Sequence, residues 1–260
     1  MITKIQLSQN TSNITAFTIN RGTVKPQNPY SEFNLCDYTC DDAMHVLDCR
    51  MQLCMELGID MDKLIMPRQT HTSNVVVIDD SFFEMDIDKQ EQYLNNVDGL
   101  ITNIKDVCIG VNTADCVPIL LAAPTKGIIA AIHAGWRGTA NRIAQKAVDS
   151  MISMGTKATD ILIGFGPSIC PQCFEVGSEV VEQFRDNGFD VNNFTYIDSQ
   201  SSRPHIDLIK ANYTLLLEAG INEQSIAINA ECTKCNPNKY FSARNLGIKS
   251  GRTFTGIIMK

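Results

Sequence analysis

Histidine and tryptophan are the scarce residues of this 260-residue chain, which has four histidines and one tryptophan. The histidines are His45, His71, His133 and His205. A metal site in this chain therefore has few imidazoles to draw on, which excludes sites built from many histidines. The same scarcity makes any hypothesis of a histidine-bound metal easy to test.

Long hydrophobic runs and positive charge are also missing. The longest apolar stretches, 116–124 and 127–133, fall far short of the ~20 residues that a membrane-spanning helix needs. The N-terminal segment has no apolar signal-peptide core, so we expect a cytoplasmic protein with no membrane partner. The formal net charge of −7 provides no field that attracts a polyanion, so no nucleic-acid partner is expected.

Valine- and isoleucine-rich runs predict strands throughout the chain. The expected strands are 74–78, 99–102, 107–111, 117–121, 128–133, 161–165, 225–229 and 253–259. Strands that follow one another directly between 99 and 133 argue against a simple alternating βαβ fold. We expect a layered α/β fold, a central mixed β-sandwich flanked by helices, in a single domain over residues 1–260.

Three segments have helical periodicity, at 39–58, 139–155 and about 204–220. Thr39 is the expected N-cap of the first helix, and Gly58 the residue that ends it. Its predicted buried stripe consists of Met44, Leu47, Met51 and Cys54. The acidic segment 79–92 lacks glycine and proline and is expected to be a surface excursion.

Two chemically reactive residues lie at the far ends of a predicted hairpin. Cys116 precedes the strand 117–121, and His133 ends the strand 128–133. Antiparallel pairing would place these ends side by side. His71, which precedes another apolar strand, could add a third ligand. Three protein ligands with an open position are typical of catalytic zinc.

The turn after His133 reads Ala134-Gly135-Trp136-Arg137-Gly138-Thr139, with a helix expected to begin at Thr139. A strand followed by a glycine turn and a helix N-terminus offers free N–H groups to an anion. Arg137 could add a guanidinium that forks onto phosphate.

Two C-x-x-C pairs compete as a metal site: Cys170 with Cys173, and Cys232 with Cys235. About sixty residues separate them, well beyond the usual spacing of structural zinc sites. Ordinary reduced thiols are therefore the favoured interpretation, with a second metal site or a redox-labile cluster as the alternative. The H-x-E signature of zinc nucleobase deaminases is absent.

Taken together, the motifs resemble those of the YfiH family, and they occur in family order across about residues 15–260. They are Gln69-Thr70-His71, Val97-Asp98-Gly99-Leu100, Thr113-Ala114-Asp115-Cys116-Val117-Pro118, the segment 133–139, Gly166-Pro167-Ser168-Ile169, the segment 173–177, Cys232-Thr233 and Phe241-Ser242-Ala243-Arg244. The chain departs from the family at 21–24, a weak version of a Gly-Gly turn. It also departs at Cys49-Arg50, where Asn-Arg is usual, and at 243–245, where a more basic segment is usual.

The resemblance implies a zinc ion on His71, Cys116 and His133, within a layered α/β fold. It also implies purine nucleoside chemistry: phosphorolysis of adenosine, inosine and methylthioadenosine, and deamination of adenosine. The small-molecule partners would be nucleoside and phosphate.

Residue roles for this chemistry are hypotheses. Asp115 is the nearest candidate to carry a proton, beside Cys116 and His133. Arg50 and Arg137 are the expected anion-binding residues, with Arg244 as a third. Asn34 and Gln69 are candidates to hydrogen-bond ribose or base.

Three other classes of function stay open. Cys116 as nucleophile with His133 as base would make a cysteine hydrolase, which could edit a peptidoglycan precursor. The same three ligands could take copper, as in a polyphenol oxidase, although four histidines are too few for a multi-copper site. A closed metal shell would instead indicate a metal-stabilised binding protein.

Overall fold

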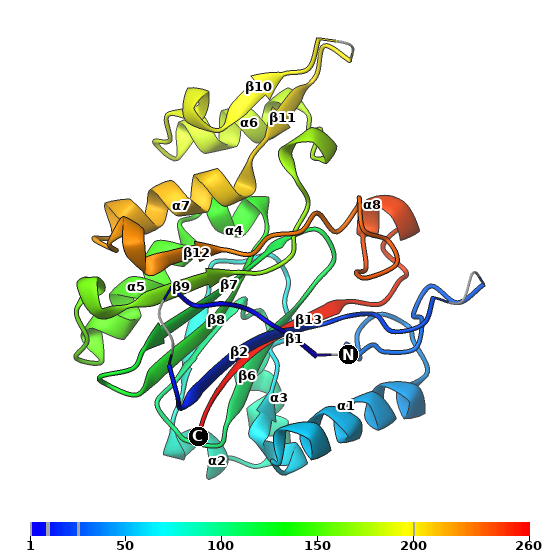
Figure 1. The fold of residues 1–260 in the computed structure, drawn as a ribbon, viewed down its shortest axis with the longest axis vertical. Coiled ribbons are helices and arrows are strands. Elements are labelled where there is room, and N and C mark those ends of the chain that lie inside the picture. Colours follow the sequence, from blue (N-terminus) through cyan, green and yellow to red (C-terminus); the bar gives the residue numbers. More distant parts are fainter. Residues whose placement is uncertain (1, 9–10, 25–26, 200) are drawn as a thin grey trace.

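The computed structural model describes residues 2–8, 11–24, 27–199 and 201–260. Two sheets stack face to face, and helices cover the outer face of each (Figure 1). This arrangement confirms the predicted layered α/β fold with a central β-sandwich and flanking helices.

The first sheet has the order β1-β2-β13-β6-β3, and the second has the order β12-β9-β7-β8-β5-β4. The strands of the first are β1 (Ile2–Lys4), β2 (Ile14–Ile19), β3 (Leu64–Ile65), β6 (Cys108–Thr113) and β13 (Thr253–Met259). Those of the second are β4 (Val75–Ile78), β5 (Gly99–Thr102), β7 (Val117–Ala123), β8 (Ile128–Ala134), β9 (Leu162–Phe165) and β12 (Ile226–Ile228). A separate hairpin pairs β10 (Thr195–Ile197) with β11 (Pro204–Ile206). All eight predicted strands are present, and β1, β2, β3, β10 and β11 were not predicted.

The helices are α1 (Ala43–Leu57), α2 (Asp80–Phe83), α3 (Ile87–Leu94), α4 (Trp136–Ala140), α5 (Ile143–Ser153), α6 (Ser178–Asp186), α7 (Leu208–Glu218) and α8 (Ala243–Leu246). Short 3₁₀ turns include Pro171–Cys173. No described helix combines the length and the apolar character that crossing a bilayer would require.

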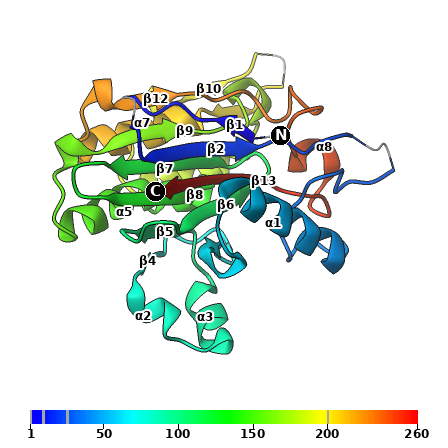
Figure 2. The same ribbon diagram turned by 60° about the horizontal axis from the view of Figure 1, so that its bottom comes forward.

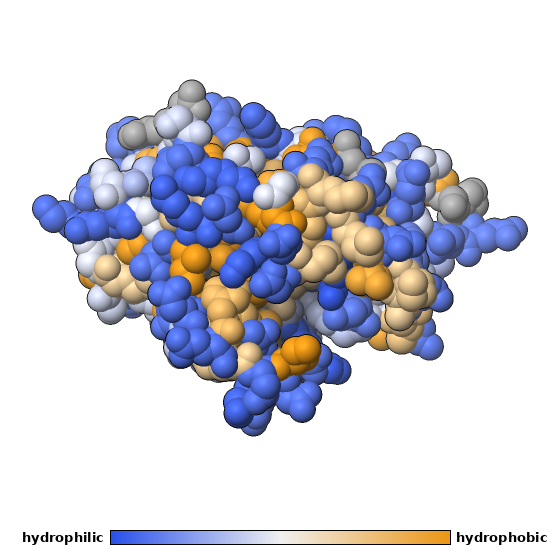
Figure 3. All heavy atoms as spheres, turned by 90° about the horizontal axis from the view of Figure 1, so that it is seen from below, coloured by the Kyte–Doolittle hydropathy of each residue, from blue (hydrophilic) through white to orange (hydrophobic). Residues whose placement is uncertain are grey.

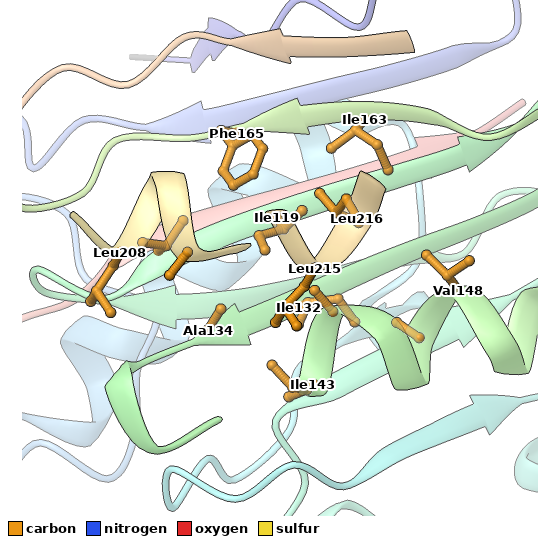
Figure 4. Close-up of a cluster of buried hydrophobic side chains, with 14 of the residues drawn as sticks. Ile119, Ile132, Ala134, Ile143, Val148, Ile163, Phe165, Leu208, Leu215 and Leu216 are labelled. Atoms are coloured by element: carbon orange, nitrogen blue, oxygen red, sulfur yellow. The ribbon is translucent and has the colours of Figure 1, made fainter. Parts of the chain in front are cut away.

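Alternation along the central strands explains the layers. In β7, Ile119 and Leu121 face α5 and α7, whereas Leu120 and Ala122 face the first sheet. Figure 4 shows side chains of β7, β8, β9, α5 and α7 meeting in the helix-facing cluster. A third cluster lies between the first sheet and α1 and includes Leu53. Successive residues of a strand point to opposite faces of the sheet. A fully apolar strand therefore contributes side chains to the hydrophobic cores on both faces.

The predicted helix boundaries need correction at their N-terminal ends. The first helix is capped by Asp42, whose side chain accepts the His45 N–H, and not by Thr39. The second helix begins at Trp136 rather than Thr139, and left-handed backbone at Arg142 divides it into α4 and α5. The third begins at Leu208, because 204–206 form β11. Gly58 ends α1 in the left-handed conformation, as predicted.

The predicted buried face of α1 was right at Cys54 and wrong at Met44, Leu47 and Met51. Val46, Cys49 and Leu53 are buried, whereas Met44 is 63% exposed and Met51 is 44% exposed. Both faces of α1 carry apolar residues, so periodicity alone could not choose between them. The view from below, the side on which α1 lies in Figure 1, shows apolar groups interrupting a largely hydrophilic surface (Figure 3).

The acidic segment 79–92 forms α2 and most of α3, which project from the body of the molecule (Figure 2). Most of its residues are exposed, as a surface excursion predicts. Phe82 is the exception, because it packs into the core between the two sheets.

Candidate metal centre and its surroundings

Cys116 and His133 meet because β7 and β8 form the predicted hairpin. Their antiparallel register pairs Pro118 with His133, which places Cys116 at the same edge of the sheet. Cys116 lies where the chain crosses from β6 of the first sheet to β7 of the second. Loops at such strand ends are free to carry reactive groups because the scaffold below them is rigid.

The structure brings His71, Cys116 and His133 together, with one ligand atom of each within 4.8 Å of the others. Cys116 Sγ lies 3.8 Å from His71 Nε2, and the two imidazoles meet edge to face. His71 is exposed, Cys116 is half-buried and His133 is buried. One thiolate and two imidazoles are a donor set that zinc and copper both accept, and the His71 side is open to solvent.

Asp98 organises this cluster from behind. Its fully buried carboxylate accepts the backbone N–H groups of Thr70, His71 and Thr72, the Thr72 hydroxyl and His133 Nδ1, the last at 2.6 Å. A buried carboxylate costs several kcal/mol unless it is paired, and these five bonds offset that cost. The bond to Nδ1 leaves Nε2 of His133 to face Cys116, so Asp98 selects the tautomer.

Two backbone features let the ligands approach closely. His71 and Asp115 have positive φ angles of 63° and 90°, in the left-handed region that non-glycine residues rarely adopt. A Cβ added at Gly135 would lie 3.0 Å from both Cys116 Sγ and His71 Cδ2. Any larger residue at position 135 would therefore press on Cys116 or His71, which would have to move by a few tenths of an ångström. Strained backbone clusters at functional sites, where the surrounding structure holds it.

Cys116 and His133 influence each other's protonation. Burial alone would raise the pKa of Cys116, but the positive His133 lowers that pKa to about 6. Burial alone would lower the pKa of His133, but the Cys116 thiolate and Asp98 raise it to about 9. Without a metal ion, the pair is a thiolate and an imidazolium near neutral pH. A metal ion would take the thiolate as it stands and displace the proton from His133.

Asp115 is buried between three segments that meet beside Cys116. Its carboxylate accepts the Thr233 hydroxyl at 2.7 Å and the Arg244 backbone N–H at 2.9 Å. Its own carbonyl accepts the Ile169 N–H. A carboxylate has about four acceptor positions, so acceptor capacity remains for a substrate or a water molecule.

The three predicted anion-binding arginines occupy different places. Arg137 is exposed, and its guanidinium lies over the ring of Trp136, next to Gly135. Arg244 is exposed beside Asp115, and its guanidinium donates to the Glu175 carbonyl. Arg50 of α1 is paired with Asp37 and the Leu35 carbonyl. Arg137 and Arg244 are thus linked through neighbouring residues to the cluster, whereas Arg50 contacts the segment that precedes α1.

Asn34 and Gln69, predicted to bind ribose or base, are buried and engaged inside the protein. Both ends of the Gln69 amide bond the backbone of Asn112. The Asn34 amide bonds several groups, including Asp41 and the Arg252 N–H. These bonds give both side chains a positioning role, and direct substrate contact stays a prediction.

Several buried oxygen atoms on the segments that precede or contact Asp115 lack a protein partner. Among the described residues they include Asn112 Oδ1, Thr113 Oγ1, Ser168 Oγ and Ser242 Oγ. Buried polar atoms are nearly always hydrogen-bonded, so such a group is suited to a polar ligand or to water.

Sequence reasoning assigned no role to Asp98, Thr72 or Thr233, which shape the site. Asp98 stands immediately before β5, one residue before Gly99, and β5 pairs with β8. The available signal was an aspartate immediately before a strand that pairs with the strand of His133. It could have indicated a carboxylate close to that histidine. Thr233 offered no comparable signal, because it reaches Asp115 across 118 residues.

Comparison with known proteins agrees with this architecture. Residues 14–260 match the family model described as multi-copper polyphenol oxidoreductase laccase. Adenosine deaminase RL5, from an unknown prokaryotic organism, is 48% identical over 257 residues, which cover 99% of this chain and 98% of that protein. A purine nucleoside phosphorylase of Bacteroides thetaiotaomicron is 36% identical over 252 residues, which cover 95% of this chain and 92% of that protein. The crystal structure of YlmD from Geobacillus stearothermophilus superposes with a TM-score of 0.86 at 27% identity, covering 96% and 93%.

The crystal structure of the YfiH protein of Bacillus licheniformis is similar to the same degree, with a TM-score of 0.85 at 27% identity, over 95% of this chain and 93% of that one. The motifs, the fold and the full-length matches therefore agree. The chain belongs to the multi-copper polyphenol oxidoreductase laccase family, which includes the YfiH proteins that its motifs resemble.

Proposed function

We propose that this chain is a zinc-dependent purine nucleoside enzyme. It phosphorolyses adenosine, inosine and methylthioadenosine, and it deaminates adenosine. The observation that carries the proposal is the convergence of His71, Cys116 and His133 within 4.8 Å, with the His71 side exposed. The names of the relatives, adenosine deaminase RL5 and purine nucleoside phosphorylase, support the choice of substrate.

The three ligands fit a catalytic rather than a structural ion, because they leave one coordination position open. A bound zinc ion would supply a Lewis acid and bring the pKa of water near neutrality. Asp98 bonds His133 at Nδ1, which leaves Nε2 available to hold the metal, and it fixes the turn that carries His71. Gly135 leaves room for Cys116 and His71 to approach together.

In deamination, a water oxygen bonds to C6 of adenine and ammonia leaves, which gives inosine. The leaving nitrogen needs a proton, and we assign its transfer to Asp115, which lies next to Cys116 in the sequence. Thr233 and the Arg244 N–H hold the Asp115 carboxylate in place. Because the Asp115 carboxylate is already held in position, little free energy is spent on reorienting it when the proton is transferred.

In phosphorolysis, a phosphate oxygen bonds to ribose C1′ while the bond from C1′ to the base nitrogen breaks. The base takes up a proton, and negative charge on the phosphate must be held throughout. We assign this role to Arg137, whose guanidinium lies over Trp136, and to Arg244, whose backbone N–H donates to Asp115. Arg50 would join them only by leaving Asp37.

The test is to incubate purified protein with adenosine, with and without phosphate, and to separate the products. Adenine with ribose 1-phosphate reports phosphorolysis, and inosine reports deamination. His133→Ala should abolish both, whereas His45→Ala, which removes an imidazole on α1 outside the cluster, should retain them. Equal turnover by His133→Ala and the unchanged protein would refute the proposal.

A second candidate is a cysteine hydrolase, favoured by the lowered pKa of Cys116 beside His133. A chelator separates the two, because it stops a zinc reaction and spares a thiol nucleophile. Multi-copper oxidation has weaker support, since His45 and His205 lie in neither of the metal-binding groups that the described residues form.

A further inference from the structure

Four cysteines far apart in the sequence converge in a second cluster. The Sγ atoms of Cys170, Cys173, Cys232 and Cys235 all lie within 4.8 Å of one another. The favoured sequence interpretation, ordinary separate thiols, rested on the sixty-residue gap between the pairs. In the folded chain the two pairs nevertheless lie next to each other.

Parallel pairing of β9 with β12 explains the convergence. The two strands run side by side, with Phe165 opposite Ile228, so the chain leaves both at the same edge of the sheet. An isolated bridge between Ser168 and Cys232 continues the parallel contact beyond the strands. Each C-x-x-C pair then turns back immediately, the first through the 3₁₀ turn Pro171–Cys173.

The cluster differs from the ordinary cysteines of this chain. Cys36, Cys49, Cys54 and Cys108 are buried in the protein, as small apolar residues usually are. The four clustered cysteines are half-buried or exposed. Burial in an apolar core therefore does not explain why four thiols share one place.

The sulfur atoms are spaced for one ion. Tetrahedral zinc with Zn–S bonds of about 2.3 Å places its sulfur ligands about 3.8 Å apart. Cys173 Sγ and Cys235 Sγ are 3.5 Å apart. Backbone N–H groups of Cys170 and Cys235 point to Cys232 Sγ, and that of Cys173 points to Cys170 Sγ. N–H donors of this kind stabilise negative charge on sulfur.

We propose that Cys170, Cys173, Cys232 and Cys235 bind a structural zinc ion, separate from the site of His71, Cys116 and His133. Four protein thiolates close the coordination shell, so this ion holds loops rather than substrate. An iron–sulfur cluster fits less well, because inorganic sulfide between the irons would spread the four thiolates.

The loops that this ion joins also hold Asp115. The segment before Cys170 donates the Ile169 N–H to the Asp115 carbonyl, and the Cys232 loop donates the Thr233 hydroxyl to its carboxylate. Zinc at the four cysteines therefore fixes, through two hydrogen bonds, the residue that precedes Cys116.

The experiment counts zinc and identifies its ligands in the full chain purified under reducing conditions. The unchanged protein should hold about two zinc ions, and His133→Ala about one, bound at the four cysteines. X-ray absorption of His133→Ala should then show sulfur neighbours alone, at about 2.3 Å. Cys173→Ser should lose the second ion, whereas Cys40→Ser, at an exposed cysteine outside both clusters, should keep both.

The proposal is overturned if His133→Ala binds no zinc, if its zinc has nitrogen neighbours, or if the cluster holds iron. Disulfides within the cluster in the reduced preparation would also overturn it. His133→Ala decides the matter even where Cys173→Ser does not fold. The experiment measures the zinc content and the atoms bound to zinc. Its result therefore does not depend on whether the protein turns over any nucleoside.

Discussion

The two candidate metal clusters lie at one edge of the second sheet but differ in composition and setting. His71, Cys116 and His133 mix imidazole with thiolate and leave one side exposed, whereas the second cluster offers four thiols. The first lies where the chain crosses between the two sheets, and the second joins loops that follow two parallel strands. The same sheet edge thus brings together two groups, one of three mixed ligands and one of four thiols, and these numbers are typical of catalytic and structural zinc sites respectively.

Support for the ligands also differs. In the first cluster a buried side chain, Asp98, orients His133 and the His71 turn. In the second, backbone N–H groups of the turns point at sulfur. Because one carboxylate, Asp98, orients the ligands of the first cluster, a single substitution can disturb that cluster. The backbone N–H groups that point at sulfur in the second cluster are present whatever the side chains are.

The largest expected difference is between Cys116→Ser and Cys173→Ser. Cys116→Ser should reduce adenosine turnover roughly a thousandfold, because a catalytic ion supplies several kcal/mol of transition-state stabilisation. Cys173→Ser should lower the thermal midpoint and reduce turnover only several-fold at temperatures where the protein is folded, because it loosens the loops that hold Asp115. Steady-state rates and thermal melts measured on both variants check this. Equal activity losses would mean that the two clusters form one functional unit.

Asp98→Asn should weaken zinc binding at the first cluster by roughly 10- to 100-fold, the usual cost of losing the partner of a metal-bound histidine. The amide keeps the shape of Asp98 but not its charge. Competition with a chromogenic chelator measures the affinity. Asp88→Asn, at an exposed residue of α3, is the matched control. Unchanged affinity in Asp98→Asn would show that the hydrogen bond to His133 does not support the metal.

The metal-stripped protein should reveal the ion pair of the first cluster by its pH dependence. Only the thiolate is alkylated, so the Cys116 rate should rise with pH through about 6 and then level off. His133→Ala removes the stabilising positive charge, so the midpoint should move up toward about 8.5, the ordinary thiol value. Mass spectrometry of the Cys116 peptide follows the reaction. A profile that is the same in both proteins would rule out this pairing.

Local signals predicted one cluster and left the other only as an alternative, for a physical reason. Cys116 and His133 are joined by a short hairpin, whose alternation of residues and turn can be recognised locally. The four cysteines depend on β12, a strand of three residues, pairing with β9 across about sixty positions. No local pattern encodes such a pairing, because loop closure and sheet order are decided by the whole fold.

The same distinction applies to the rest of the fold. The central strands were predicted because β-branched residues fill them and both faces are buried. The burial of α1 was not, because Met44 and Met51 compete with Val46 and Leu53 for the core. The role of Asp98 was missed since it exists only when the turn at 70–72 wraps around the carboxylate.

The smallest expected effect tests the connection between the clusters. Thr233→Val keeps the side-chain volume and removes the hydroxyl that donates to Asp115 Oδ1. Bonds to charged groups contribute roughly 1.5–3 kcal/mol, so the free energy of unfolding should fall by about that amount. Turnover should fall several-fold if Asp115 carries the proton, while both zinc ions remain bound. Thr214→Val, whose hydroxyl bonds only its own helix, is the control. Loss of zinc from either cluster, or turnover equal to that of the control, would mean that Thr233 does not link the four cysteines to Asp115.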